Sequence, residues 1–121
     1  MLPVLHVCTT CRAGTQPQDG VPVPGRVLYD RLAALPQDSV RLVGVECLSV
    51  CNAGCAAAIS MPGKWSYLLG RLTPEKAEDM LSFAATYRTS KTGTVMPSKR
   101  PASLADMVLG RIPSPLPGEA A

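Results

Sequence analysis

The stretch PVLHVCTTC (residues 3–11) and the stretch VRLVGVECLSVC (residues 40–51) follow one plan, a short apolar run that ends in cysteines. Runs of this length that are rich in Val and Leu favour β-strands, so we predict strands over 3–7 and 40–45. Between them, leucines at i, i+4 and i+7 predict a helix over 25–35. A strand, a helix and a second strand build a right-handed unit of parallel strands whose carboxyl ends meet at one edge of a sheet. Both cysteine groups are therefore expected at that edge.

The middle of the chain predicts a β-hairpin and a second helix. Residues 56–60 and 65–69 have the composition of strands, and the MPGK segment at 61–64 has the Pro-Gly pair of a type II turn. The TPE sequence at 73–75 supplies an N-cap, a first helical position and an acidic first turn for a helix that runs to about Arg88. The order β-α-β-β-β-α predicts a thioredoxin-like α/β fold, with a mixed sheet of about four strands and flanking helices.

The last quarter of the chain differs in composition and is rich in Pro. We predict a thioredoxin-like domain over residues 1–89 and a Pro-rich C-terminal extension over residues 90–121. Within the extension we expect a short helix over 104–109 and a mobile tail from residue 114.

Composition excludes several classes of function. The 121 residues suffice for one domain, and 46% of them are hydrophobic, as in ordinary globular proteins. The net charge of +3 comes without a basic cluster interleaved with aromatic residues, so no nucleic acid is expected as a partner. No apolar run approaches the roughly 20 residues that span a bilayer, and the N-terminal residues lack the pattern of a secretory signal. We therefore expect a cytoplasmic protein with no membrane partner.

The chemistry of the chain is concentrated in its cysteines. There are five: Cys8, Cys11, Cys47, Cys51 and Cys55. An odd number without a secretory signal argues against a disulfide framework and for metal binding or thiol chemistry. Thiolates are soft ligands that suit iron–sulfur clusters, zinc and copper(I), and two groups at one sheet edge can supply four of them. The C-x3-C-x3-C spacing of the second group departs from the paired C-x2-C of zinc ribbons.

Three interpretations stay open from the residues alone. The first is an iron–sulfur protein. The second is a zinc or cobalt thiolate protein, such as a metallochaperone or a structural site. The third is a dithiol oxidoreductase that uses Cys8 and Cys11, but such a dithiol is activated by a helix N-terminus directly after it. Cys11 is followed instead by a stretch rich in Pro and Gly, with no helix predicted before residue 25, which disfavours this third interpretation.

Two short segments resemble a known family. CLSVC at 47–51 is similar to the ligand segment of thioredoxin-like 2Fe–2S ferredoxins and of the related small subunit of NADH dehydrogenase complexes. VCTTC at 7–11 matches that family in place and context, with a tighter cysteine spacing than the family norm. The resemblance implies a 2Fe–2S cluster and one-electron transfer without substrate chemistry, in a ferredoxin-like carrier that is not an enzyme. It also implies four ligands, which are Cys8, Cys11, Cys47 and Cys51.

Residues 3–113 resemble still more closely a family of small uncharacterised bacterial proteins described only as predicted metal-binding. The marks of that family here are VCTTC at 7–11, the segment 46–55, PGKW at 62–65, RP at 100–101 and RIP at 111–113. This second resemblance implies a metabolic context of cobalt and cobalamin. Relatives of the thioredoxin-like fold pair as homodimers, so a homodimer is also an expectation, while the redox partner protein is not specified by the sequence.

The fifth cysteine, Cys55, has three alternative roles. It can pack as a small hydrophobe against the strand that follows it. It can be an alternative ligand in place of Cys11 or Cys51. It can also be a redox-active or ligand-exchange thiol.

Other polar and aromatic residues receive structural interpretations. His6, the only histidine, lies within a predicted strand, and Glu46 precedes Cys47 at a strand end. For Trp65 we favour a core or dimer contact over partner docking or cluster shielding. The late basic residues could form a patch for an acidic redox partner, but scattered solvated charges are the simpler explanation; these residues are Arg88, Lys91, Lys99, Arg100 and Arg111.

Overall fold

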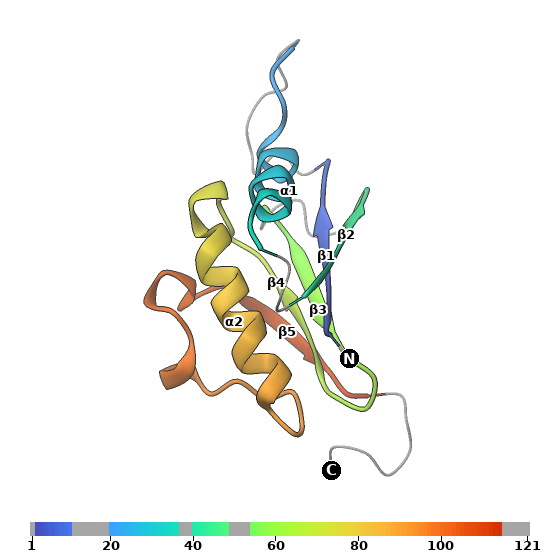
Figure 1. The fold of residues 1–121 in the computed structure, drawn as a ribbon, viewed down its shortest axis with the longest axis vertical. Coiled ribbons are helices and arrows are strands. Elements are labelled where there is room, and N and C mark those ends of the chain that lie inside the picture. The colour runs from blue at the N-terminus through green and yellow to red at the C-terminus, as the bar shows by residue number, and fades with distance from the viewer. Residues whose placement is uncertain (1, 11–19, 37–39, 49–53, 115–121) are drawn as a thin grey trace.

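The computed structural model describes residues 2–10, 20–36, 40–48 and 54–114. They form one mixed five-stranded sheet in the order β2-β1-β3-β4-β5, and α1 and α2 cover the same face of it (Figure 1). The predicted α/β architecture with flanking helices is confirmed, with one strand more than expected. In chain order the helices and strands are β1 Val4–Cys8, α1 Pro24–Ala34, β2 Arg41–Val45, β3 Ala57–Ser60, β4 Ser66–Leu69, α2 Ala77–Thr89 and β5 Val108–Ile112.

The strands β1 and β2 are parallel neighbours, as the sequence predicts. Their register pairs Val4 with Arg41 and Cys8 with Val45, so the two strands end side by side. The connecting helix α1 begins with Pro24, whose fixed φ and missing N–H suit a first turn. The apolar stripe of α1 is buried against the sheet, and its innermost residues are Leu28 and Leu32.

The strands β3 and β4 form the predicted hairpin. The N–H of Lys64 donates to the carbonyl of Met61 at 3.1 Å, which closes a four-residue turn. Gly63 has a φ of +77°, the value that a type II turn requires at its third position and that residues with a Cβ rarely adopt. Because β3 also pairs antiparallel with β1, the hairpin turn lies at the end of the sheet opposite Cys8.

The second helix begins later than the sequence predicts. Pro74–Lys76 form a 3₁₀ turn, and α2 runs from there as Ala77–Thr89. Thr73 stands at the N-cap position, but its hydroxyl makes no capping bond to the backbone. The pKa of Glu75 is lowered, first by a hydrogen bond from its own backbone N–H and second by the Thr73 hydroxyl. The predicted positions of Thr73, Pro74 and Glu75 at the start of this helical segment are confirmed, but the Thr73 hydroxyl bonds the Glu75 carboxylate rather than the backbone.

The short helix predicted over 104–109 is also wrong. Residues Ala102–Leu104 form a 3₁₀ turn, and Val108–Ile112 form β5, which pairs antiparallel with β4. Leu68 of β4 lies opposite Gly110, and the register shifts between Leu68 and its successor. Edge pairing with β4 outweighs the weak helical pattern here. The fifth strand thus comes from the predicted extension, while the predicted tail lies almost wholly outside the described residues.

The hydrophobic core lies between the sheet and the two helices. Tyr67 of β4 packs edge-on against Phe83 and Tyr87 of α2, with ring centroids 5.6 and 6.3 Å apart. Edge-to-face contacts of this kind stabilise a core beyond the burial of apolar area alone. The helix-covered side of the sheet is thereby committed to the core.

Candidate metal centre at the carboxyl ends of β1 and β2

Cys8 is the last residue of β1 and is almost fully buried, with 2% of its surface exposed. Its backbone N–H donates to the carbonyl of Ala56 at 3.0 Å, which holds it to the start of β3. Its thiol donates to the carbonyl of Glu46 at 3.4 Å, and its Sγ lies 3.7 Å from the hydroxyl of Thr10. Leu48 packs beside it over Ala56. The first cysteine group is therefore in direct contact with the segment that carries the second.

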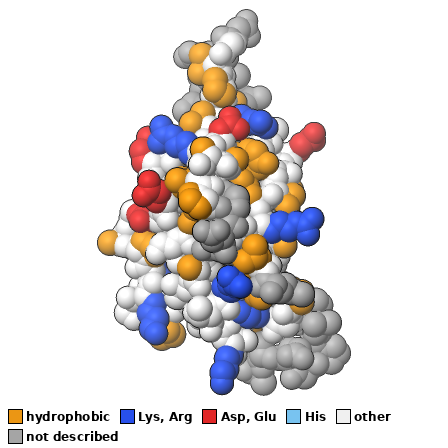
Figure 2. Space-filling view, viewed as in Figure 1, with side chains coloured by type: hydrophobic (Ala, Val, Ile, Leu, Met, Phe, Trp, Pro, Cys, Tyr) orange, Lys and Arg blue, Asp and Glu red, His pale blue; other side chains and the backbone are white. Residues whose placement is uncertain are grey.

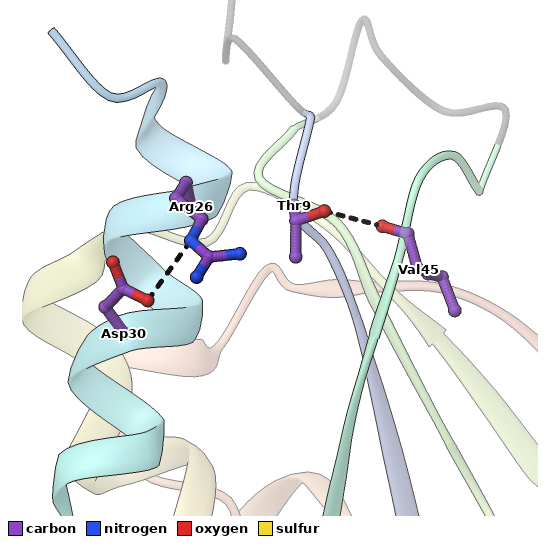
Figure 3. A network of polar contacts seen from close by, with 4 residues as sticks. All are labelled: Thr9, Arg26, Asp30 and Val45. Carbon is purple, nitrogen blue, oxygen red and sulfur yellow. Dashed lines mark hydrogen bonds and ion pairs between the residues drawn. The ribbon is translucent and has the colours of Figure 1, made fainter.

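The ends of the two parallel strands are joined by Thr9. Its backbone N–H and its hydroxyl both donate to the carbonyl oxygen of Val45, at 2.8 and 3.2 Å. Figure 3 shows the hydroxyl pointing at that carbonyl across the gap between the strand ends. The hydroxyl of Thr10 makes a further bond to the carbonyl of Glu46. We call this set of contacts the strand-end clamp: Thr9 and Thr10 as donors, Val45 and Glu46 as acceptors.

A glycine lets α1 close over the clamp. A Cβ placed on Gly44 would lie 3.0 Å from Cγ2 of Thr9 and 3.2 Å from Cε2 of Tyr29. Arg26 stacks over the Tyr29 ring, with 5.3 Å from Cζ to the centroid, and pairs with Asp30 at 3.2 Å (Figure 3). Arg26, Tyr29 and Asp30 have no distinguishing sequence signature. The sequence signal for this packing is Gly44, because a glycine inside a strand often marks a close approach.

Cys47 lies two residues beyond the end of β2 and is exposed to solvent. Of the four predicted ligands, the structure thus places Cys8 and Cys47 at the same edge of the sheet. The other two, Cys11 and Cys51, lie outside the described residues. Within the described ranges, no group of three or more His, Cys, Asp or Glu side chains is arranged to hold a metal ion.

Cys55 is in a different environment from the other two described cysteines. It is fully buried within the main hydrophobic core, on the helix-covered side of the sheet. Its N–H and carbonyl exchange two backbone hydrogen bonds with Leu72, both at 3.2 Å, and its peptide bond to Gly54 is cis. Cys8 belongs to a separate small cluster with Ala56.

Other candidate residues lie away from this edge. His6 is half-buried in the middle of β1, and its neighbours in register are Val43 and Ala58. Trp65 begins the β4 region at the opposite end of the sheet, where its carbonyl accepts a bond from the Tyr87 hydroxyl at 2.7 Å. No helix in the described part of the chain is long and apolar enough to cross a membrane.

Comparison with known proteins identifies a family and a fold. The family described as "Protein of unknown function (DUF1636)" matches residues 5–114. No curated protein matches the sequence. A solved structure, a thioredoxin-like 2Fe-2S ferredoxin from Aquifex aeolicus, superimposes with a TM-score of 0.53 at 16% identity, covering 91% of this chain and 92% of that one. At this identity the likeness shows the fold alone, and it confirms the thioredoxin-like architecture.

Proposed function

The chain belongs to the DUF1636 family, and for this member we propose that it binds a 2Fe–2S cluster and works as a one-electron carrier. The proposed ligands are Cys8, Cys11, Cys47 and Cys51. In this proposal the protein is not a catalyst, and the cluster supplies only the uptake and release of an electron.

One observation carries the proposal. The parallel register of β1 and β2 sets Cys8 beside Val45, and the Cys8 thiol reaches the carbonyl of Glu46, the residue before Cys47. Thiols from both cysteine groups therefore belong to one sheet edge, which is the arrangement that a four-thiolate centre needs. Soft sulfur donors fit a cluster or zinc better than they fit hard cations such as magnesium.

The surroundings of Cys8 also suit a cluster ligand. Burial of Cys8 beside Ala56 and Leu48 would keep water from one side of a bound group, while the exposed Cys47 would leave the other side near the surface. Low exposure and hydrogen bonds to the sulfur atoms tune cluster potentials. The strand-end clamp would hold the two cysteine segments at a fixed separation in either redox state.

The fold comparison supports the proposal at a coarser level. A thioredoxin-like 2Fe-2S ferredoxin shares this architecture over almost the whole of both chains. Fold alone does not determine function. The cysteine placement in this chain is what connects the shared fold to cluster chemistry.

Within this proposal Cys55 packs and does not ligate. It lies in the main core, whereas Cys8 and Ala56 form a separate cluster at the edge. A thiolate buried in this core would need compensating charge, while a neutral thiol packs there as a small hydrophobe.

The test is anaerobic purification without added metal, followed by analysis of iron, acid-labile sulfide, zinc and cobalt per chain. Equal iron and sulfide, about two of each per chain, with a visible spectrum that bleaches on reduction by dithionite, would support the cluster. Zinc or cobalt near one per chain without sulfide would overturn it in favour of a metal-thiolate protein, for which the same soft donors are suited. Absence of metal together with a dithiol that cycles between oxidised and reduced forms would favour the oxidoreductase.

A further inference from the structure

A group of basic side chains lies at the end of the sheet opposite the cysteines. Ser66 of β4 pairs with Ile112 of β5 there, close to the hairpin turn. The N–H of Trp65 donates to the carbonyl of Thr92 at 2.9 Å, which attaches the loop after α2 to the start of β4. We call this surface the basic end and define it by five cationic residues: Lys64, Arg88, Lys91, Arg100 and Arg111.

Shared contacts bring Lys64, Arg88, Arg100 and Arg111 together. The Cζ atoms of Arg100 and Arg111 lie 5.8 and 5.5 Å from the centroid of the same ring, that of Tyr67. The ammonium of Lys64 donates to the carbonyls of Tyr87 and Arg88 at the end of α2, at 3.3 and 2.7 Å. The five cations come from the β3–β4 turn, the end of α2, the loop that follows it and the end of β5.

No carboxylate within these segments balances the charge. Residues 61–67, 87–101 and 108–114 contain no Asp or Glu. In the described part of the chain, the one ion pair is Arg26–Asp30, on α1 near the cysteine edge. Figure 2 shows the same separation on the face in view, where the acidic side chains lie in the upper half and only Lys and Arg are charged in the lower half.

Lys64 shows the effect of this imbalance. Its pKa is lowered, first by burial and second by the nearby positive charge of Arg88. The Lys64 ammonium already donates to the helix carbonyls. Within the described residues, Arg88, Lys91, Arg100 and Arg111 form no ion pair.

Two of the guanidinium groups are held in place before any partner arrives. Arg111 lies 4.5 Å from the Trp65 ring centroid and donates to the hydroxyl of Thr94 at 2.7 Å. The Nε of Arg100 donates to the carbonyl of Val95 at 3.0 Å. A planar guanidinium that is already stacked loses little freedom on binding, and its remaining N–H groups match a carboxylate well.

The aromatic and apolar residues indicate the class of partner. Single-stranded nucleic acid needs exposed aromatic faces on which bases stack. Tyr67 is buried, and Arg111 stacks on Trp65. By contrast, Met96 and Ile112 are large apolar side chains exposed by 57% and 58%. Arg, aromatic residues and Met together are the composition of protein–protein interfaces.

We propose that the basic end docks a protein whose contact surface presents Asp and Glu carboxylates around an apolar centre. The basic end is separate from the cysteine edge, so a protein bound at the basic end leaves the cysteine edge exposed. The proposal does not depend on which metal or cluster the cysteines bind.

The probe is a synthetic peptide of Asp and Glu with two interspersed Leu residues, and the reporter is the fluorescence of Trp65, the single tryptophan of the chain. We expect the peptide to bind at low salt, to change this fluorescence and to be released by added salt. Duplex DNA and vesicles that contain phosphatidylglycerol are the comparison probes. If either binds more tightly than the peptide at equal negative charge, the proposal is overturned.

The decisive variant is Arg88→Gln with Lys91→Gln, since both side chains are exposed and their loss should leave the fold intact. The control is Arg26→Gln with Arg31→Gln on α1, which lowers the net charge by the same amount. We expect the first pair to weaken peptide binding about fivefold and the control to leave it nearly unchanged. Equal weakening in both would mean that only net charge matters, and would overturn the proposal.

Discussion

Thr9 donates two hydrogen bonds to a single acceptor, the carbonyl oxygen of Val45, from its backbone N–H at 2.8 Å and from its hydroxyl at 3.2 Å. The first bond continues the pairing of β1 with β2 by one residue. The second uses a side chain to join the same strand ends. Because Cys8 precedes Thr9 and Cys47 lies two residues after Val45, these two hydrogen bonds fix the separation of the two cysteine segments.

Replacement of Thr9 by Val tests the hydrogen bond that the Thr9 hydroxyl donates to the Val45 carbonyl. Val keeps the shape of Thr but cannot donate, so we expect the free energy of unfolding to fall by about 1 kcal/mol. The measurement is urea denaturation followed by circular dichroism. The control is Thr86→Val on α2, where an exposed hydroxyl bonds the carbonyl of Ser82 and its loss should cost less than about 0.5 kcal/mol. Equal losses in the two variants would contradict a special role for Thr9.

Replacement of Gly44 by Ala tests the close packing of α1 over β2. The added Cβ would lie 3.0 Å from Thr9 and 3.2 Å from Tyr29, so one of them must shift. Overpacking of this kind typically destabilises by about 1–3 kcal/mol. Gly110→Ala in β5 is the matched control, because a Cβ there meets nothing within 4 Å. Thermal unfolding of the two variants should give a clearly lower midpoint for the first, and similar midpoints would contradict the packing argument.

Cysteine variants separate ligands from packing residues. Cys47 is exposed, so Cys47→Ser should keep the fold while removing the bound iron and its visible spectrum. Cys55→Ala should keep the iron, but it should lower stability by about 1 kcal/mol because it leaves a small void in the core. The readouts are iron per chain and the urea midpoint. Loss of iron from Cys55→Ala would instead support Cys55 as a ligand.

The raised pKa of Tyr87 predicts that the free energy of unfolding depends on pH in the alkaline range. Burial, followed by the neighbouring Tyr67, raises the pKa of Tyr87 from 10.0 to about 12. The folded state therefore holds this proton more tightly than the unfolded state, so the contribution to stability is complete below pH 10.0 and is lost as pH rises towards about 12. The Tyr87→Phe variant lacks both the titrating group and its bond to the Trp65 carbonyl.

The measurement for Tyr87 is the free energy of unfolding of the parent chain minus that of Tyr87→Phe across the pH range. At neutral pH the parent should be more stable by about 1 kcal/mol, the usual worth of one hydrogen bond. Above pH 10 that advantage should shrink, and it should continue to shrink as pH approaches 12. A difference that stays constant with pH would show that the hydroxyl does not titrate in this way.

The sequence predicted much of this fold because its signals are local. The apolar runs before Cys8 and Cys47 define β1 and β2, and the handedness of a strand–helix–strand unit then places both ends at one edge. The Pro-Gly turn after β3 has its signature within four residues, and the structure confirms it.

The remaining features depend on contacts that are distant in sequence. The segment of β5 has a glycine at its centre and a weak helical pattern, and only its pairing with β4 makes it a strand. The clamp joins Thr9 to a carbonyl 36 positions away, and a main-chain acceptor leaves no side-chain signature. The placements of Cys11 and Cys51 lie outside the described residues, so the full ligand set stays a prediction.

The pairing of β5 with β4 also has a consequence for the order in which the chain can fold during synthesis. The edge of β4 that faces away from β3 has no strand beside it until Val108–Ile112 have left the ribosome. An open strand edge is a template for pairing with other chains. A ribosome that stalls before residue 108 would therefore hold a nascent chain whose cysteine segments are complete but whose sheet is still open to aggregation.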